Sequence, residues 1–500
     1  MIQPRPQKYV YPDSSRGRIR RFIREGQHPE SIAERLAALK PALPSGKAFP
    51  LVIAVVPSYN EQVPILRTLQ SLRDQTRRPD EIIVLADNCT DDTVALAISA
   101  GVSVVETIDN GDGKAGALNV LLTEIMPILD DDDVVLVMDA DTVLTERFIE
   151  STVITLFEPS KKKIAGVGGI FLADDDKWSL TRQLQANEYV RYRRRLSRRM
   201  GRALVLTGTG TAFKVGFMRD VQKARRAGRL PDLGEGGSVY DISALTEDNE
   251  LTLCAKDLGY RVISPKDCTV KTVMMPTLGS LYKQRLRWQR GALENLIAHG
   301  LTTHTAPYAL RQVLTYLGVV FLPFYLWTLT IALLVANTSL NFLEPLWLLV
   351  AAMYVFEQTF SVRKGGWRAV LVSLSVAPEV FLKVFLDIVY VASFWGALLA
   401  TDEVWGRVRS LDTSKFDKRG RPLQASFRKV RSLLHGTHAK RQTWQSRVLV
   451  GGFLVFALAV TIEVILLPLA HLPTAWLILA IYVLIGFLAT LGRLVPMRTG

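Results

Sequence analysis

The sequence contains few cysteines, and this scarcity excludes two kinds of stabilising site. Only Cys89, Cys254 and Cys268 occur among 500 residues. Their number is odd and their spacing fits no metal-binding motif, so we expect neither a disulfide framework nor a zinc site. Reduced thiols of this kind are typical of cytoplasmic proteins.

The first part of the chain, residues 1–47, lacks a continuous apolar run. We therefore expect no signal peptide and no membrane anchor there. Five arginines instead surround three apolar residues between positions 16 and 24: Arg16, Arg18, Arg20, Arg21 and Arg24 around Ile19, Phe22 and Ile23. This pattern is typical of an interfacial helix on anionic lipid or of a solvated basic tail. Prolines at 41, 44 and 50 predict a linker, so residues 1–48 form a separate basic segment.

Nucleic-acid recognition motifs are absent as well, although the chain is strongly basic. Its net charge of +14 and pI near 9.6 suit a nucleic acid, an anionic membrane or a phosphorylated substrate. The basic residues cluster before and between apolar segments, which favours a lipid bilayer as partner and no nucleic acid. A mean hydropathy of +0.18 agrees, because the apolar residues are concentrated in the C-terminal third.

Short β-rich segments alternate with helical ones from residue 51 onward. Four of them have the composition of buried strands: residues 51–56, 81–86, 102–106 and 134–138. Such alternation predicts an α/β fold with a parallel sheet, whose ligands bind beyond the carboxyl ends of the strands. Polar motifs stand at three of these ends: residues 58–61, 87–92 and 139–142.

Asp139 and Asp141 follow the strand predicted at 134–138 directly. Two carboxylates one residue apart can bind one Mg²⁺ or Mn²⁺ and leave coordination sites for phosphate oxygens. The same spacing is common in exposed turns, so the position after a buried strand is what favours a metal site.

Two further polar positions suit a nucleotide. Asp87 follows the second predicted strand and can accept a hydrogen bond from a base or a ribose. Residues 109–116 form a glycine-containing loop in which Lys114 opens a helix, and this arrangement suits a diphosphate as well as it suits a plain turn. The spacing is not that of a P-loop.

A second acidic pair, Glu247 and Asp248, precedes a helical segment at 249–258. Asp248 can act as a general base, whereas the structural alternative is a helix cap at Thr246 or Asp248. Gln284, Arg287 and Trp288 follow at helical spacing. Trp288 can stack on a sugar ring and Arg287 can bind phosphate, or both can rest on lipid headgroups.

The C-terminal third, residues 301–500, has the composition of a membrane domain. Four segments are long enough to cross a bilayer: residues 314–336, 346–362, 448–470 and 475–491. Residues 369–400 are also apolar but are broken at Pro378. If they lie in the interface or re-enter, the basic loop at 401–447 stays on the cytoplasmic side. We therefore expect four transmembrane helices and one interfacial or re-entrant element.

Taken together and in order, these residues resemble the processive, membrane-integrated family-2 glycosyltransferases, the group of cellulose, chitin, hyaluronan and poly-N-acetylglucosamine synthases. The opening nucleotide-binding turn, the acceptor-end loop and the signature at the channel entrance have these counterparts here: Pro57, Tyr59 and Glu61 in 57–61; Thr209 and Gly210 in 207–213; and Gln284, Arg287 and Trp288. Asp87 matches the family's uridine-binding aspartate, Lys114 its diphosphate-side lysine, Asp139 and Asp141 its metal pair, and Asp248, next to Glu247, its base.

The resemblance implies a GT-A nucleotide-sugar-binding domain at residues 49–300, with a mixed, mostly parallel sheet, followed by an α-helical transmembrane domain. It also implies a UDP-sugar donor, Mg²⁺ or Mn²⁺, inversion at the anomeric carbon, and a catalytic domain on the cytoplasmic side of the plasma membrane. The chain departs from the pattern in three places. It has Ala86 before Asp87, where many members carry two aspartates, it lacks membrane helices ahead of the domain, and only Trp405 and residues 412–420 faintly match the gating loop.

Three functions therefore stand as hypotheses. The first is elongation of a polysaccharide at the cytosolic membrane face, with translocation of the product. The second keeps the same site but transfers a single sugar to a lipid or other membrane acceptor. The third is a non-catalytic membrane protein that binds sugar nucleotides.

Overall fold

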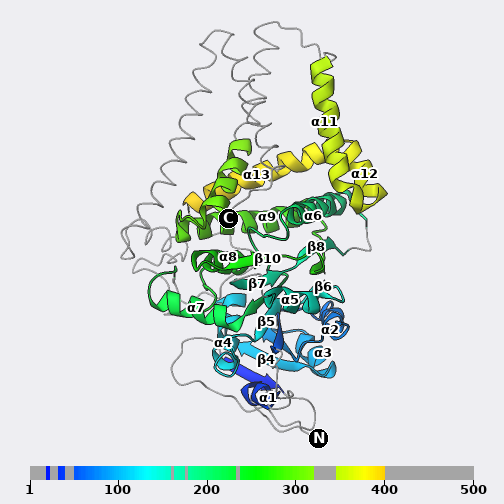
Figure 1. Ribbon diagram of the computed structural model, residues 1–500. Coiled ribbons are helices and arrows are strands. Elements are labelled where there is room, and N and C mark those ends of the chain that lie inside the picture. Colours follow the sequence, from blue (N-terminus) through cyan, green and yellow to red (C-terminus); the bar gives the residue numbers. More distant parts are fainter. Residues whose placement is uncertain are drawn as a thin grey trace, which may run out of the picture.

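The computed structural model describes residues 18–22, 32–39, 50–158, 163–174, 178–231, 237–319 and 345–399. The predicted spans at 448–470 and 475–491, the basic loop at 401–447, and the larger part of 314–336 lie outside these residues. Figure 1 shows an α/β domain built on a central sheet, with a layer of long helices across one side of it.

The central sheet has eight strands in the order β1-β4-β3-β2-β5-β9-β7-β10. Their bounds are β1 Arg18–Phe22, β2 Val52–Ser58, β3 Glu81–Asp87, β4 Ser103–Ile108, β5 Val134–Met138, β7 Ile164–Gly168, β9 Gly210–Lys214 and β10 Arg261–Ile263. Strands β4, β3, β2 and β5 are parallel, as are β7 and β10, whereas β1 and β9 run antiparallel to their neighbours. The four predicted strands are confirmed, and the sheet is mixed and mostly parallel.

Alternate residues of the strands enter two separate cores because side chains of a strand point to opposite faces. Ile53, Val55 and Val135 pack with helices α1 Ile32–Leu39, α4 Gly113–Ile125, α7 Val215–Arg226 and α8 Glu247–Asp257. Val52, Ala54 and Leu136 pack with α2 Ile65–Arg73, α3 Thr93–Ser99 and α5 Phe148–Leu156 on the other face. The domain is thus a three-layer α/β structure, with the carboxyl ends of the central parallel strands meeting along one edge.

A second, three-stranded sheet lies beside this edge and has the order β6-β11-β8. Its strands are β6 Thr142–Leu144, β8 Ile170–Ala173 and β11 Thr269–Thr272. Helices α6 Leu180–Arg198 and α9 Leu278–His299 follow the strands β8 and β11 in the sequence. In Figure 1 both helices lie across the upper side of the domain, beneath the last described helices.

The chain is also helical at 306–319, and three further helices and a 3-10 turn end its described part: α11 Pro345–Val362, η2 Arg363–Gly365, α12 Trp367–Leu374 and α13 Ala377–Leu399. Helix α13 runs along α9, and α12 packs on α6. No single helix among the described residues has the length and hydropathy needed to cross a bilayer. Helix α12 together with Ala377–Phe394 meets the requirement only as a pair bent by 79°.

One expectation needs correction. The arginine-rich segment is neither a helix nor a plain tail at residues 18–22, because these residues form β1 and pair with β4. Arg20 and Phe22 stand in a two-residue alternation that suits a strand, and the available sheet edge decides the conformation. The crossing expected at 346–362 coincides with α11 and stays a prediction.

Candidate active site

The candidate site lies at the carboxyl ends of β2, β3 and β5, where the sequence predicts it. Asp139 and Asp141 occupy the turn between β5 and β6. Backbone contacts fix this turn: the Asp139 amide donates to the Thr209 carbonyl at 3.3 Å, and the Thr142 amide donates to the Asp139 carbonyl at 3.2 Å. The buried Thr68 hydroxyl donates to the Ala140 carbonyl at 2.6 Å. The two carboxylates are therefore held on a rigid support.

Lys114 joins the two acidic pairs. Its Nζ lies 2.6 Å from Asp139 Oδ1 and 3.1 Å from Glu247 Oε1. Lys114 is the second residue of α4 and Glu247 is the first of α8, so two helix N-termini meet at this ammonium group. Because Asp248 is the next residue after Glu247, one lysine side chain brings the predicted metal pair and the predicted base into one site.

Asp248 lies at the start of α8, against the loop before β9. Its Oδ2 accepts a hydrogen bond of 2.7 Å from the Gly208 amide. Burial and, after it, the neighbouring Glu247 carboxylate raise the pKa of Asp248 to about 6, against the lowering effect of Lys114. Burial would also raise the pKa of Glu247, but Lys114 outweighs it and lowers that pKa. Glu247 is thus held ionised, whereas the pKa of Asp248 lies closer to neutrality, which suits a general base.

Helix α9 holds the N-terminus of α8 in place. Asn295 Nδ2 donates to the Thr246 carbonyl at 3.0 Å and to the Thr246 hydroxyl at 3.1 Å. Thr246 precedes the helix, but its side chain forms no capping bond to it. Gly291 faces the same threonine so closely that an added Cβ would lie 2.4 Å from Thr246 Oγ1. The absence of a side chain at 291 therefore lets α9 approach the residue that leads into Glu247 and Asp248.

We expect Gly291→Ala to lower both activity and stability. The methyl group would push Thr246 away from α9, and overpacking of this kind costs about 1–3 kcal/mol. Thermal unfolding and the initial rate of the same preparation measure the two effects. Gly279→Ala is the matched control, because an added Cβ in that glycine of α9 meets nothing closer than 4.0 Å. Equal behaviour of the two variants would show that the contact with Thr246 is unimportant.

On the predicted nucleotide side, Asp87 also makes hydrogen bonds within the protein. Asp87 is buried, and its Oδ1 accepts hydrogen bonds of 2.8 Å from both the Thr107 hydroxyl and Asn110 Nδ2. Asn110 Nδ2 also donates to the Gly113 carbonyl at 2.8 Å. Asp87 therefore ties down the loop that carries Lys114, a role that the sequence does not reveal.

The turn after β2 places the other predicted nucleotide residues at the same edge. Pro57 lies within β2 opposite Leu85 of β3, and Tyr59 is 56% exposed just beyond the strand. Asn60 has a positive φ of 56° and its Oδ1 accepts from the Thr90 amide at 2.8 Å. Burial raises the pKa of Glu61 to about 7, with further contributions from Asp141 and Asp139. The Glu61 carboxylate thus lies within electrostatic range of the predicted metal pair.

Thr209 and Gly210 stand at the start of β9. The carbonyl of Thr209 accepts the Asp139 amide, and that of Gly210 accepts the Gly169 amide at 2.8 Å. Gly210 is buried, and a Cβ there would lie 3.1 Å from Val270. The backbone of Thr209 bonds to Asp139, and the backbone of Gly208 bonds to Asp248. The loop 207–209 therefore connects these two acids.

Trp288 belongs to an aromatic group at the outer end of the site. Its ring is stacked on Phe171 with centroids 6.4 Å apart, and Phe171 is stacked on Tyr189 at 5.1 Å. The guanidinium over Trp288 is that of Arg285, 4.5 Å from the ring centroid. We call Trp288, Phe171, Tyr189 and Arg285 the Trp288 platform.

Arg287 and Gln284, which share α9 with Trp288, have separate surroundings. Arg287 lies close enough to lower the pKa of both Glu247 and Asp248, after the larger effects named above. Gln284 Oε1 is buried without a hydrogen-bond partner among the described residues. A buried amide oxygen of this kind is available to a bound hydroxyl group. Arg287 therefore lies near the acidic pair, and Gln284 offers a buried acceptor on the same helix.

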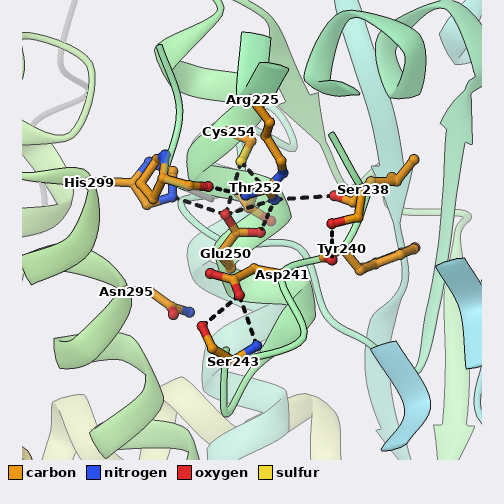
Figure 2. A network of polar contacts seen from close by, with 12 residues as sticks. Arg225, Ser238, Tyr240, Asp241, Ser243, Glu250, Thr252, Cys254, Asn295 and His299 are labelled. Carbon is orange, nitrogen blue, oxygen red and sulfur yellow. Dashed lines mark hydrogen bonds and ion pairs between the residues drawn. The ribbon is translucent and has the colours of Figure 1, made fainter. Parts of the chain in front are cut away.

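A network of buried polar side chains packs around Glu250 of α8 (Figure 2). Arg225 Nη2 donates to Glu250 Oε1 at 2.9 Å and to Oε2 at 2.8 Å, and both side chains are almost fully buried. His299 Nε2 lies 3.3 Å from Glu250 Oε1, and its Nδ1 lies 2.6 Å from Asp257 Oδ2. Cys254 Sγ donates to Glu250 Oε1 at 3.1 Å. The network joins α7, α8 and the end of α9.

Glu250, Cys254 and His299 have ligand atoms within 4.8 Å of one another, but their chemistry does not suit a metal ion. Burial and, after it, the Glu250 carboxylate raise the pKa of the Cys254 thiol to about 11. Burial would lower the pKa of His299, yet its bond to Asp257, followed by those to Cys254 and Glu250, raises it well above the usual value. Arg225 already occupies both oxygens of Glu250. Protons and a guanidinium satisfy the cluster, so its role is structural.

We expect Arg225→Met to destabilise the domain by about 3–5 kcal/mol, because removal of one partner leaves the other buried charge uncompensated. The pKa of Glu250 is well below its usual range, with burial opposing and Arg225 lowering it. Its ionised form contributes stability above pH 4.5 that is lost as pH falls. Denaturant unfolding at pH 7 measures the loss. Arg226→Met, at the exposed next position, should change stability little. Equal losses in the two variants would contradict the assignment.

Asp139 and Asp141 do suit a hard divalent cation. Both offer carboxylate oxygens, the ligands that Mg²⁺ and Mn²⁺ prefer. Burial and, after it, repulsion from Asp139 raise the pKa of Asp141 to about 6. A crowded pair of acids of this kind gains from a cation placed between them.

Several residues that complete the site could not be predicted from the sequence: Asn110, Asn295, Gly291, Phe171, Tyr189 and Arg285. Only Gly291, three residues after the 284–288 motif, left a signal in the sequence.

Comparisons with known proteins agree with this geometry. Residues 50–291 match the model of the family described as glycosyltransferase like family 2. The probable glycosyltransferase YdaM of Bacillus subtilis is 27% identical over 254 residues, which cover 49% of this chain and 56% of that protein. The poly-beta-1,6-N-acetyl-D-glucosamine synthase of Staphylococcus aureus is 25% identical over 251 residues, 49% of this chain and 55% of that one. The chain therefore spans about half the length of the curated relatives it matches.

Solved structures also resemble this chain at low identity. A mannosyltransferase from Pyrobaculum calidifontis, in complex with GDP-Man and Mn²⁺, has a TM-score of 0.40 and 15% identity, and the match covers 74% of this chain and 94% of that one. A glucosyl-3-phosphoglycerate synthase from Mycobacterium tuberculosis, in complex with Mn²⁺, UDP and phosphoglyceric acid, has a TM-score of 0.32 and 18% identity. That match covers 56% of this chain and 89% of the synthase.

Proposed function

We propose that residues 50–291, which match the model of glycosyltransferase like family 2, transfer a sugar from a UDP-sugar to a growing polysaccharide at the cytosolic face of a membrane. Inversion at the anomeric carbon, dependence on Mg²⁺ or Mn²⁺, and translocation of the product through its own helices are parts of this proposal. The observation that carries it is the Lys114 contact with both Asp139 and Glu247.

The residues divide the reaction between them. Asp248, whose orientation the Gly208 amide fixes, takes the proton of the acceptor hydroxyl as that oxygen attacks the sugar. Lys114 and Arg287 bring positive charge to the diphosphate side, where charge builds up on the leaving UDP. Asp139 and Asp141 would hold the divalent cation, which as a Lewis acid stabilises the leaving phosphate when bound. Trp288 supplies an aromatic surface for a sugar ring.

Transfer of a single sugar to a lipid or other membrane acceptor is the second candidate. The exposed apolar side chains of α12 and α13 favour a membrane-associated acceptor in either case. Because the domain is that of an enzyme, the non-catalytic hypothesis is set aside.

The purified full chain in detergent, with Mg²⁺ or Mn²⁺, tests the proposal when it is screened for UDP release against a panel of UDP-sugars. We expect release with one donor or a small set of donors. Product that resists organic extraction supports polysaccharide elongation, and an extractable product with one added sugar supports the second candidate. No UDP release from any donor, by a preparation that binds UDP, would contradict both.

The acid side of the pH profile offers a further prediction. Asp248 must be ionised to act as the base, and its pKa is raised to about 6. We therefore expect kcat/KM, which reports the free enzyme, to rise between pH 5 and pH 7 and to fall about tenfold per pH unit well below the pKa. A profile that stays flat from pH 5 to pH 7 would remove Asp248 from the base role.

A further inference from the structure

A buried polar cluster joins the catalytic domain to the last described helices. Arg191 of α6 binds Glu379 of α13 through two bonds of 2.8 Å, from Nη1 to Oε2 and from Nη2 to Oε1. Arg191 Nε also donates to the Ser361 hydroxyl at 3.0 Å, and Nη2 donates to the Ser373 hydroxyl at 3.2 Å. Asn187 Nδ2 donates to Glu379 Oε1 at 3.0 Å. We call these five residues the Arg191 joint.

The joint has a fixed geometry. Glu379 is 7% exposed and Asn187 is fully buried, so both have lost their water. A buried ion pair is costly to desolvate and gives little net stability, but it strongly disfavours any arrangement that separates its partners. The planar guanidinium meets the carboxylate in parallel and reaches two hydroxyl groups at once. Helices α11, α12 and α13 are thereby held in one orientation relative to α6.

The other side of α6 contacts the Trp288 platform. Glu188, next to Asn187 in sequence, accepts from Arg285 Nη2 at 2.8 Å. Tyr189 is stacked on Phe171, which is stacked on Trp288. Residues 187–191 therefore contact the last described helices through two side chains and the Trp288 platform through two others. One turn of α6 connects the two regions.

The outer face of α12 and α13 is apolar and is bordered by cations. Trp367 is 70% exposed and Leu371 is 58% exposed, and further exposed apolar side chains extend along both helices: Leu374, Val380, Phe381, Val384, Ile388 and Val391. Arg363, Lys364 and Arg368 are exposed at one end of this face. Apolar side chains flanked by arginine and lysine suit the headgroup boundary of an anionic bilayer.

We propose that Arg191 is a positioning residue, which transmits the seating of α12 and α13 on an anionic lipid surface to the Trp288 platform. The proposal rests on the proposed function in one respect, namely that the platform serves sugar transfer. When the joint is intact, lipid contact fixes the direction of α6 and so the place of Trp288 relative to Asp248. When the joint is broken, α13 still lies along α9, but α6 and its Tyr189 lose their fixed link to the lipid-facing helices.

The test uses the full chain in nanodiscs and a variant that removes both buried charges. Arg191→Met with Glu379→Met leaves no uncompensated ion, so folding is preserved. Arg193→Gln, at an exposed position of the same helix, is the control for the charge change. Hydrogen exchange of residues 180–198, which contain Glu188 and Tyr189, is compared in nanodiscs of neutral lipid and of lipid with one quarter phosphatidylglycerol.

We expect anionic lipid to slow exchange in residues 367–391 of all three proteins. In residues 180–198 it should slow exchange at least fivefold in the wild type and in Arg193→Gln, but not in the double variant. UDP affinity should stay within twofold in all three, while the KM for the acceptor should rise about tenfold in the double variant. Equal lipid effects on 180–198 in the double variant, or no lipid effect on 367–391, would overturn the proposal. If the double variant loses the lipid effect as expected, but even the wild type releases no UDP from any donor, the proposed function alone is refuted.

Discussion

Replacing Asp248 with asparagine is expected to lower the rate of sugar transfer by about 10²–10⁴-fold, the usual contribution of a general base. Asparagine has the same shape and its amide oxygen still accepts the Gly208 amide, so the loop at 207–209 stays in place. UDP binding should change by no more than about twofold, because Lys114, Asp139 and Asp141 are untouched. The rate of UDP release and the UDP dissociation constant, measured on the same preparation, separate these two effects.

Asp267→Asn serves as the matched control for Asp248→Asn, since Asp267 is exposed and accepts a hydrogen bond only through its backbone carbonyl in the described contacts. We expect this variant to keep wild-type activity. Retained turnover in Asp248→Asn would show that another group removes the acceptor proton. Glu247 would then be the first alternative, although its low pKa makes it the weaker base.

Asp141→Asn should have the second-largest effect, a loss of about a hundredfold or more in activity. A divalent cation on such a pair contributes several kcal/mol to stabilisation of the leaving group, and each tenfold in rate corresponds to about 1.4 kcal/mol. The variant should also need a higher Mn²⁺ concentration for half-maximal UDP binding. A metal titration followed by UDP binding shows this shift without any sugar donor.

The acidic run before β5 supplies the comparison for Asp141→Asn. Asp132 is exposed and pairs with Lys214 at 3.3 Å on the opposite end of the strand. Asp132→Asn removes the same charge a few residues away and should leave the metal dependence unaltered. If the two variants shift the metal titration equally, the effect is one of overall charge, and the pair at 139 and 141 is not a metal site.

The central part of the fold follows from local patterns. Residues 134–138 are all apolar and all buried in β5, and the polar motifs predicted at strand ends meet at one edge of the sheet. The spacing of apolar residues and the position of turn residues are enough to predict these strands, because each strand is specified by a few neighbouring positions. Helix α8, predicted at 249–258, begins two residues earlier than expected, at Glu247.

The remainder of the site depends on pairs that are distant in sequence. Lys114 meets Glu247 and Asn110 meets Asp87 only after the sheet has formed. Strand β9 lies antiparallel between β5 and β7, and the spacing of apolar residues in the sequence does not predict this strand order. The bend between α12 and α13 was expected near Pro378, and it lies just before it, where Val376 has a φ of 60°. Its direction is set by Glu379 and Arg191, which only tertiary structure brings together.

The most direct measurement is the location of Mn²⁺ by its anomalous scattering in crystals of the full chain grown with Mn²⁺ and UDP. We expect one strong peak between the Asp141 carboxylate and the UDP diphosphate, with Lys114 turned from Asp139 toward the phosphates and Asp248 open to the acceptor side. A peak at Glu250, Cys254 and His299, or bound UDP with no ion beside Asp139 and Asp141, would contradict the assignment of this site.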